Sequence, residues 1–241
     1  MAQRRAWQVC PKQFLALVLA VVFAAGGCVA PPTTTKAAKY PAHYEEHPLV
    51  IMALPPVNNT TSADAKEYYA TTIIEPFARS GYYVIPFNIT ADILKSQGLY
   101  DTEMIGDQPV AKFGEFFGAD AVLFTQINKW DTSYVVLASS LTVSVTAKLK
   151  STKSERVLWE YTGTMVVDLS GRSNSGNALA DLIAAVVVTA INTAAADYVP
   201  YAMKVNYFML NNMPAGKYHP NFEKDRETKI FDQKTGTQRI Q

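Results

Sequence analysis

Apolar side chains change their spacing several times along this chain, and each spacing predicts a different element. The runs at 49–54 and 82–87 are short and continuously apolar, which is typical of strands buried on both faces. Between them, residues 64–80 carry an apolar side chain at every fourth position, which predicts a helix that Pro76 bends or restarts and Gly81 ends. A strand, a helix and a strand over so short a stretch predict a right-handed crossover with parallel pairing.

The clearest pattern is an alternation of apolar and polar residues between positions 135 and 168. Segments 135–149 and 157–168 each place their apolar side chains on one face, and a polar turn at 151–155 separates them. This pattern predicts a long antiparallel hairpin with one dry and one wet face. Two interpretations stay open: helices cover the apolar face, or the hairpin enters a bilayer and assembles with copies of itself. The aromatic residues cluster in one part instead of bracketing both ends, which favours the first.

The remaining periodic segments complete one predicted domain over residues 48–212. They are a third strand at 119–128, short helices at 89–98 and 110–117, and a long C-terminal helix at 179–198 with the three-then-four spacing of an apolar stripe. The predicted fold is therefore α/β, with a mixed five-stranded sheet, a long antiparallel hairpin and helices packed on the sheet.

The chain beyond Pro200 is apolar at first and then polar. Tyr201, Val205, Phe208 and Met209 either continue the helix onto the body or form a contact surface for a partner, because exposed apolar patches mark interfaces. Residues 213–241 are rich in charge, proline and glycine, which predicts a poorly ordered tail or one that a partner orders.

The N-terminal segment has the layout of a secretory signal. Arg4, Arg5 and Lys12 precede a short apolar stretch, which ends in small residues directly before Cys28. We therefore expect residues 1–27 to be removed and Cys28 to be lipidated, as in bacterial lipoproteins. Residues 28–47 contain several prolines and few apolar residues, so we expect a semi-extended tether that holds the body off the membrane.

Charge and cysteine content narrow the function classes. The chain has 22 basic and 21 acidic residues, and removal of the signal takes three basic residues and no acidic one. The slightly acidic mature chain offers no basic field for nucleic acid. Both cysteines are accounted for by the signal and the anchor, so no disulfide or thiol nucleophile is expected. With its histidines confined to the predicted tether and tail, the sequence predicts no enzyme, no metal site and no cofactor.

Three stretches carry a resemblance to a known family. Residues 51–61 (Ile-Met-Ala-Leu-Pro-Pro-Val-Asn-Asn-Thr-Thr), 79–86 and 118–127 resemble a family of bacterial lipoproteins of unknown function typified by a neisserial vaccine-candidate antigen. The resemblance implies a fold similar to the N-terminal domain of TolB and to the periplasmic domain of the curli secretion lipoprotein. It also implies partners: a curli-channel-like lipoprotein and a second small lipoprotein. It carries over no catalytic residue, and Val29 after the cysteine resembles the sorting pattern for the outer membrane.

The sequence thus predicts a lipoprotein held by Cys28 on the periplasmic side of the outer membrane, with exposure at the cell surface left open. Its expected role is that of a non-catalytic accessory component of a secretion or transport assembly, acting through protein contacts. Two alternatives stay open: a self-assembling, curli-channel-like secretion pore built from the hairpin, and a periplasmic carrier of a small apolar ligand. A homo-oligomer also stays possible as a partner state.

Overall fold

A computed structural model describes residues 33–96, 98–99, 105, 109–135, 138–169, 197–231 and 237–240. The predicted signal, Cys28 and residues 179–196 of the predicted C-terminal helix lie outside the described residues and stay predictions, and residues 197–198 are described without helical structure. None of the helices in the described part is long and apolar enough to cross a membrane.

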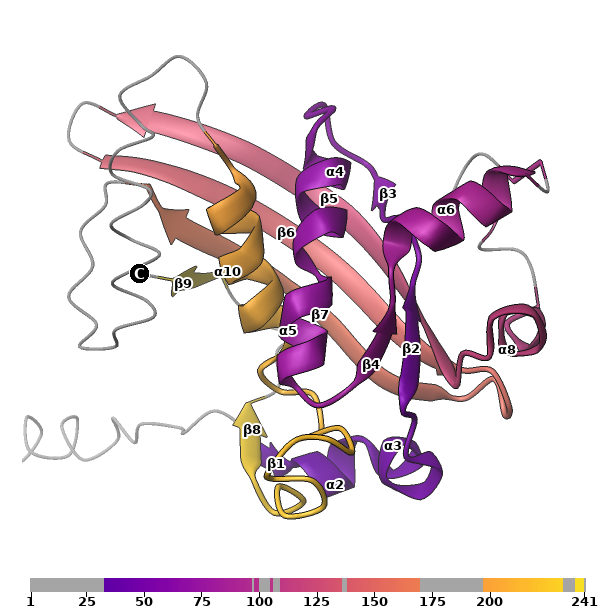
Figure 1. The fold of residues 1–241 in the computed structure, drawn as a ribbon. Coiled ribbons are helices and arrows are strands. Elements are labelled where there is room, and N and C mark those ends of the chain that lie inside the picture. The colour runs from indigo at the N-terminus through magenta and orange to yellow at the C-terminus, as the bar shows by residue number, and fades with distance from the viewer. Residues whose placement is uncertain are drawn as a thin grey trace, which may run out of the picture. The chain divides into compact units, whose positions relative to one another are not determined.

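A seven-stranded mixed sheet forms the centre of the body (Figure 1). Its strands are β2 (Val50–Ala53), β3 (Val57–Asn58), β4 (Tyr83–Ile85), β5 (Ala121–Val135), β6 (Ala138–Ser151), β7 (Val157–Asp168) and β9 (Thr237–Ile240). The order is β4-β2-β5-β6-β7-β9, and β3 pairs with β5. β2 runs parallel to β4 and β5, whereas β5, β6 and β7 are antiparallel. The predicted mixed sheet with parallel pairing and a long hairpin is confirmed. The two strands beyond the predicted five, β3 and β9, are too short to show an alternation.

Helices pack against both faces of β2. On one face lie α4 (Ala65–Thr72), α5 (Ile74–Arg79) and α10 (Val199–Leu210), and on the other lie α6 (Phe87–Ser96) and α8 (Ala111–Phe117). Ile51 and Ala53 belong to the first core, whereas Met52 and Leu54 belong to the second. This double burial explains why the sequence of β2 is continuously apolar.

The predicted helix at 64–80 is two helices, α4 and α5, separated at Ile73. Pro76 lies in the first turn of α5, where its missing N–H costs no hydrogen bond, so the helix restarts instead of continuing. Gly81 follows α5 with a φ of 90°, the left-handed conformation expected of a helix end.

The strand β5 continues beyond the predicted end at Asn128 because the chain forms a β-bulge there. Ile127 pairs with Val145 and Lys129 pairs with Ser144, which leaves Asn128 as the extra residue. The bulge shifts the inward positions by one, so that Ile127 and Trp130 both point into the core. The alternation is interrupted in the sequence, although the strand itself is not.

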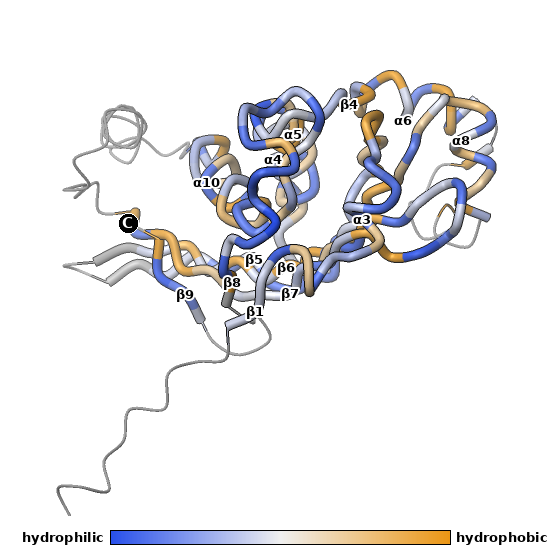
Figure 2. The backbone as a smooth tube through the Cα atoms, turned by 90° about the horizontal axis from the view of Figure 1, so that it is seen from below, coloured by the Kyte–Doolittle hydropathy of each residue, from blue (hydrophilic) through white to orange (hydrophobic). Residues whose placement is uncertain are grey.

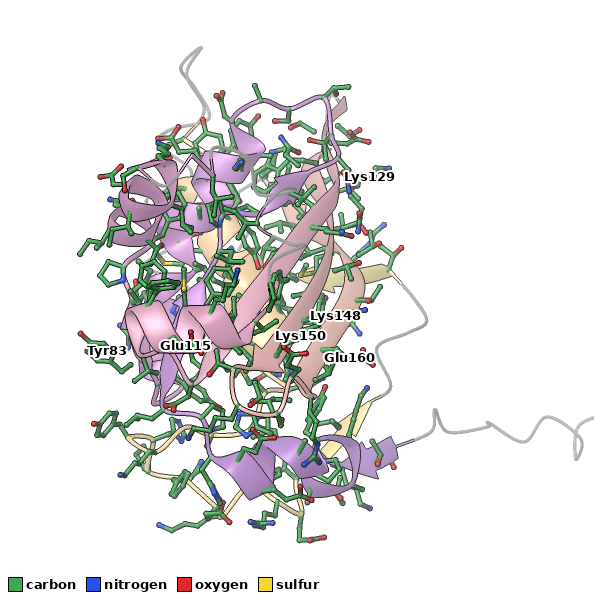
Figure 3. All side chains as sticks on the ribbon, turned by 90° about the vertical axis from the view of Figure 1, so that its right-hand side faces the viewer. Tyr83, Glu115, Lys129, Lys148, Lys150 and Glu160 are labelled. Carbon is green, nitrogen blue, oxygen red and sulfur yellow. The ribbon has the colours of Figure 1, made fainter. Side chains whose placement is uncertain are left out.

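Helices cover one side of the long strands β5, β6 and β7, and on the other side the core of α6 and α8 covers the start of β5 at Val122 and Phe124. Figure 2 shows α4, α5 and α10 on a single side of them, and the inward side chains of β6, such as Leu141 and Val145, are fully buried. The helices therefore cover the apolar face of the hairpin, as the first interpretation of the pattern predicted. On the other side, Lys129, Lys148 and Glu160 point to solvent (Figure 3).

The segments expected to be a tether and a tail are folded where the structure describes them. Residues 33–47 form β1 (Thr33–Thr35), α2 (Lys36–Lys39) and α3 (Pro41–Glu46), and β8 (Lys229–Phe231) pairs antiparallel with β1. The expectations of a semi-extended tether up to residue 47 and of a poorly ordered tail from residue 213 are therefore wrong for 33–47 and 213–231. Each segment is too polar to form a core alone; the two pair with each other and add Tyr40, Ala42, Met213 and Ile230 to the first core of the body.

Candidate functional site: a clasp at the start of the folded body

Residues 33–47 and 213–231 form one unit, which we call the clasp. Besides the pairing of β1 with β8, the Lys36 N–H donates to the Thr228 carbonyl and the Ala37 N–H to the Arg226 carbonyl, each at 3.0 Å. Thr35 caps α2 by accepting a hydrogen bond from the Ala38 N–H at 3.2 Å. The backbone of the first folded residues is thus fixed by the last part of the chain.

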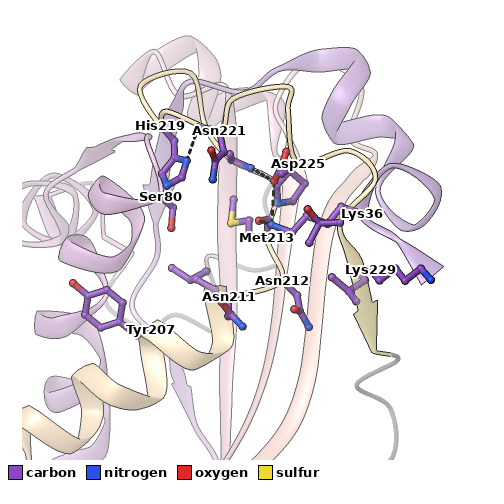
Figure 4. Close-up of a pocket in the computed structure, with 15 residues that line it drawn as sticks. Lys36, Ser80, Tyr207, Asn211, Asn212, Met213, His219, Asn221, Asp225 and Lys229 are labelled. Atoms are coloured by element: carbon purple, nitrogen blue, oxygen red, sulfur yellow. Dashed lines mark hydrogen bonds and ion pairs between the residues drawn. The ribbon is translucent and has the colours of Figure 1, made fainter. Parts of the chain in front are cut away.

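A buried ion pair lies at the centre of the clasp (Figure 4). The Lys36 Nζ is 3.0 Å from Asp225 Oδ2 and donates to the Met213 carbonyl at 2.7 Å. The side chains are only 10% and 8% exposed, respectively. Two more donors reach the carboxylate: the Tyr44 hydroxyl at 3.0 Å and the Ala215 N–H at 2.9 Å. A buried charge is tolerated only when it is paired and hydrogen-bonded, and both conditions are met here.

The donors around Asp225 outweigh the effect of its burial. Burial by itself raises the pKa of this carboxyl, but the hydrogen bonds from Lys36 and the Ala215 N–H lower it, and the net pKa lies below the ordinary value. The carboxylate is therefore charged at neutral pH, and the ion pair is complete.

A second buried contact ties the clasp to strand β4. The Tyr82 hydroxyl donates to the Pro214 carbonyl at 2.6 Å, and His43 Nε2 lies 2.9 Å from the same hydroxyl. Because the hydroxyl proton is used on Pro214, we assign the N–H to Nε2 of His43, which then donates to Tyr82. Burial lowers the pKa of His43 to about 3, so the imidazole is neutral in the folded state.

Two glycines allow the C-terminal loop to cross the turn before β4. The Gly216 N–H donates to the Ser80 carbonyl at 2.8 Å, and the Tyr218 N–H donates to the Gly81 carbonyl at 3.0 Å. A Cβ on Gly216 would lie 2.5 Å from the Gly81 oxygen, so a larger residue does not fit without a backbone shift. This close approach fixes the loop against the body.

A polar cavity of about 490 Å³ lies between the C-terminal end of α10 and the clasp. Three amide side chains, Asn211, Asn212 and Asn221, line it together with Tyr207 and Lys229 (Figure 4). The lining also includes His219 and the paired side chains of Lys36 and Asp225. Its chemistry suits solvent or a polar surface group better than an apolar ligand.

The acidic and histidine residues near residue 45 are occupied by structural contacts. His47 pairs with Glu223 at 2.5 Å, Arg156 pairs with Glu45 at 2.7 Å, and Glu46 accepts from the Ser151 and Ser154 hydroxyls. Within the described ranges, no group of three or more His, Cys, Asp or Glu residues could hold a metal ion.

The predicted partner surface is not on the surface. Tyr201, Val205 and Met209 are 2%, 0% and 0% exposed and pack in the core beneath α10, and Phe208 is half-buried against the same core. The Tyr69 hydroxyl even donates to the Met209 sulfur at 3.2 Å. A spacing of four residues defines one helix face, and here that face packs on the body. These residues therefore pack on the body, within a helix that begins at Val199.

Sequence comparison decides the family. The family described as "Putative lipoprotein GNA1162-like" matches residues 38–218, which is most of the chain. The chain belongs to this family. The resemblance to lipoproteins typified by a neisserial antigen is thereby confirmed.

Individual proteins are similar to the chain to different degrees. The chain is 31% identical over 173 residues to "Putative lipoprotein NMB1124/NMB1162" of Neisseria meningitidis serogroup B, covering 72% of this chain and 79% of that protein. The crystal structure of lipoprotein GNA1162 from Neisseria meningitidis aligns with a TM-score of 0.48 at 30% identity, over 61% of this chain and all of that one. The PelC dodecamer from Paraburkholderia phytofirmans aligns with a TM-score of 0.36 at 16% identity, over 71% of this chain and 94% of that one.

The first prediction concerns the ion pair. Asp225→Asn should lower the free energy of unfolding by about 3–5 kcal/mol, because it leaves the Lys36 ammonium buried without a counter-charge. Adding Lys36→Met should cost less than the sum of the two single changes, by about 1–3 kcal/mol. Urea unfolding of the two single variants and the double variant measures both effects. The exposed pair of Glu75 and Arg79 is the control, and Glu75→Gln should leave stability nearly unchanged. Strict additivity at Lys36 and Asp225 would contradict the assignment.

The second prediction concerns pH. Between pH 6.5 and about 3 the unfolded chain protonates His43 and the folded chain does not, so stability falls as the pH falls, by roughly 1.4 kcal/mol per unit from this group. His43→Gln keeps a donor for Tyr82 without titrating and should flatten the profile between pH 6.5 and about 4.5. Urea midpoints across this range measure the slope, with His219→Gln as the control. An unchanged slope in His43→Gln would show that this histidine is not neutral in the folded state.

Proposed function

We propose that this chain is a lipid-anchored protein of the cell envelope, held through Cys28 at the periplasmic side of the outer membrane. We further propose that it works without catalysis, as an accessory component of a secretion or transport assembly, through contacts with other proteins. Membership of a lipoprotein family and the signal-like segment before Cys28 support the anchor. The observation that carries the contact function is the outer face of β5, β6 and β7.

The outer face is the solvent-facing side of these three strands. Across the strands it contains Gln126, Thr146 and Thr162 in one row and Phe124, Lys148 and Glu160 in the next. The strands contain 15, 14 and 12 residues, against about 5–6 in an average strand. Long strands in continuous register give a broad and rigid surface.

The chemistry of this face suits a protein partner. It combines hydroxyl and amide groups, such as Gln126, Thr146 and Thr162, with charged side chains such as Lys148 and Glu160, which suits a polar protein surface. Lys150 lies over the Phe124 ring, 5.7 Å from its centre, and shields the largest apolar group at the edge of the face. The second core, with α6 and α8, covers the start of this side of β5 at Val122 and Phe124, whereas Gln126 and Thr162 are exposed. A channel-like lipoprotein or a second small lipoprotein is the partner that the resemblance implies.

The two alternatives have less support. A pore built from the hairpin would need the apolar face of β6 and β7 for the bilayer, but that face already packs against the helical layer. A carrier would need a ligand cavity between the sheet and the predicted helix at 179–198, most of which lies outside the described residues. We therefore propose the contact function ahead of the pore and the carrier.

Photo-crosslinking in native membranes tests the contact function. A photoreactive residue at Thr162, on the outer face, should give an adduct with another envelope protein, and mass spectrometry should identify it. The same residue at Thr71, which is equally a threonine exposed on α4, is the matched control and should give none. A charged Thr162→Arg variant should lose the partner in affinity purification without losing stability.

Three results would contradict parts of this proposal. Equal adducts at both positions, or none at either in a membrane-bound protein, would remove the outer face as the contact surface. Adducts with the same chain alone would favour the self-assembling alternative. Normal processing and membrane retention of Cys28→Ala would remove the anchor.

A further inference from the structure

The clasp leaves very little chain between the proposed anchor and the folded body. The first described strand begins at Thr33, so only residues 29–32 separate it from Cys28. Five residue steps of extended chain span at most about 18 Å. A 20-residue tether would have reached far beyond the headgroup layer, but this one cannot. The surface around β1 and β8 is therefore held within about two Debye lengths of the bilayer at physiological salt.

Most charges of the clasp are neutralised within the protein. Asp225 pairs with Lys36, Glu223 pairs with Arg226, and Glu45 and Glu46 pair with Arg156. The charges of these pairs cancel except at Arg156, where one cation faces two carboxylates and one negative charge remains.

Three lysines of the clasp project their charge into solvent. Lys217, Lys224 and Lys229 are exposed and take part in none of the ion pairs found among the described residues. Lys224 only donates to the Pro220 carbonyl at 3.1 Å, which keeps its charge intact. Glu227 is the one exposed acid of residues 213–231 outside these pairs, so the unpaired groups of this segment carry a net positive charge.

An exposed aromatic residue follows Lys217 directly in the sequence. Tyr218 is 69% exposed, although its own N–H is fixed to the Gly81 carbonyl. Tyrosine with lysine is the combination that favours the boundary between headgroups and hydrocarbon, because the ring is apolar and its hydroxyl is polar. Lys229 lies in β8 and pairs with Thr35 of β1, which is only two residues after the first described residue, Thr33. Lys229 and the residue that follows the linker, Thr33, therefore belong to the same small two-stranded sheet.

We propose that Lys217, Tyr218, Lys224 and Lys229, the lysine surface, dock on anionic headgroups of the membrane that holds the lipid. This inference rests on the proposed anchor at Cys28. The short linker supplies a high local concentration of headgroups, and the lysines supply the complementary charge. A single covalent anchor fixes the distance of the body from the bilayer but not its orientation, and docking of the lysine surface fixes the orientation. The clasp holds this surface rigid, so docking needs no further ordering of the loop.

Site-specific fluorescence on the lipidated, signal-processed protein tests the docking. Cys28 is blocked by its lipid and Cys10 leaves with the signal, so Tyr218→Cys provides one site for an environment-sensitive dye. The protein is reconstituted in vesicles of phosphatidylethanolamine with or without phosphatidylglycerol. With phosphatidylglycerol, we expect a blue shift and an iodide quenching constant about threefold lower, both reversed by high salt. A dye at Thr71→Cys on α4 is the control and should respond to neither.

Charge variants separate the lysine surface from net charge. Changing Lys217, Lys224 and Lys229 together to Gln should abolish the effect of phosphatidylglycerol on the Tyr218→Cys dye. The matched variant changes the exposed Lys95, Lys112 and Lys153 to Gln, with the same loss of charge, and should keep the effect.

Flotation of the same vesicles tests the anchor at Cys28 separately from docking of the lysine surface. If the protein floats but the dye at position 218 is quenched equally in both vesicle types, docking is wrong and the anchor stands. An equal loss of protection in the matched lysine variant would also overturn docking by this surface. If the protein does not float, both the anchor and the docking that rests on it are overturned.

Discussion

The ion pair between Lys36 and Asp225 is the interaction on which the organisation of the body depends. It joins two positions 189 residues apart, and two further donors complete the carboxylate's partners. Neither segment contains enough apolar residues to fold alone, so each is ordered by the other. By closing the clasp, the pair moves the start of the folded body from the expected residue 48 back to residue 33. The length of the free linker, and with it the distance from the membrane, follows from this contact.

The two faces of the sheet have different roles: one forms the core and the other faces solvent over most of its area. Helices α4, α5 and α10 bury the inward side chains of β5, β6 and β7, and this provides the stability of the body. The opposite side is then free to remain polar, because its residues are not needed for the core. The bulge at Asn128 preserves this division along the whole of β5, since it returns Trp130 to the inward side after the register changes. A rigid surface for protein contacts is thus a consequence of one-sided packing.

Local patterns in the sequence predicted the elements that bury apolar residues. The continuous run of β2 and the alternation of β6 and β7 are confirmed, and the periodic segment at 64–80 is helical as α4 and α5, because burial on one or two faces sets the spacing of apolar residues in the sequence. The clasp could not be predicted in this way. A lysine and an aspartate in two polar segments have the pattern of solvated charges, and their pairing depends on the fold. Tyr201, Val205 and Met209 show the reverse case. Their apolar stripe was visible, but only the packing of α10 decides whether it faces a partner or the body.

Hydrogen exchange of backbone amides tests most directly the claim that the anchor-bearing segment is part of the folded body. The decisive amides are those of Lys36 and Ala37, which donate to Thr228 and Arg226, compared with the Leu54 amide, which donates to Leu123 inside the main sheet. If the clasp is an integral part of the body, all three exchange slowly and at similar free energies of opening. If the Lys36 and Ala37 amides exchange at the rate of an open chain while Leu54 stays protected, the N-terminal segment is a free tether, and the account of a short linker is wrong.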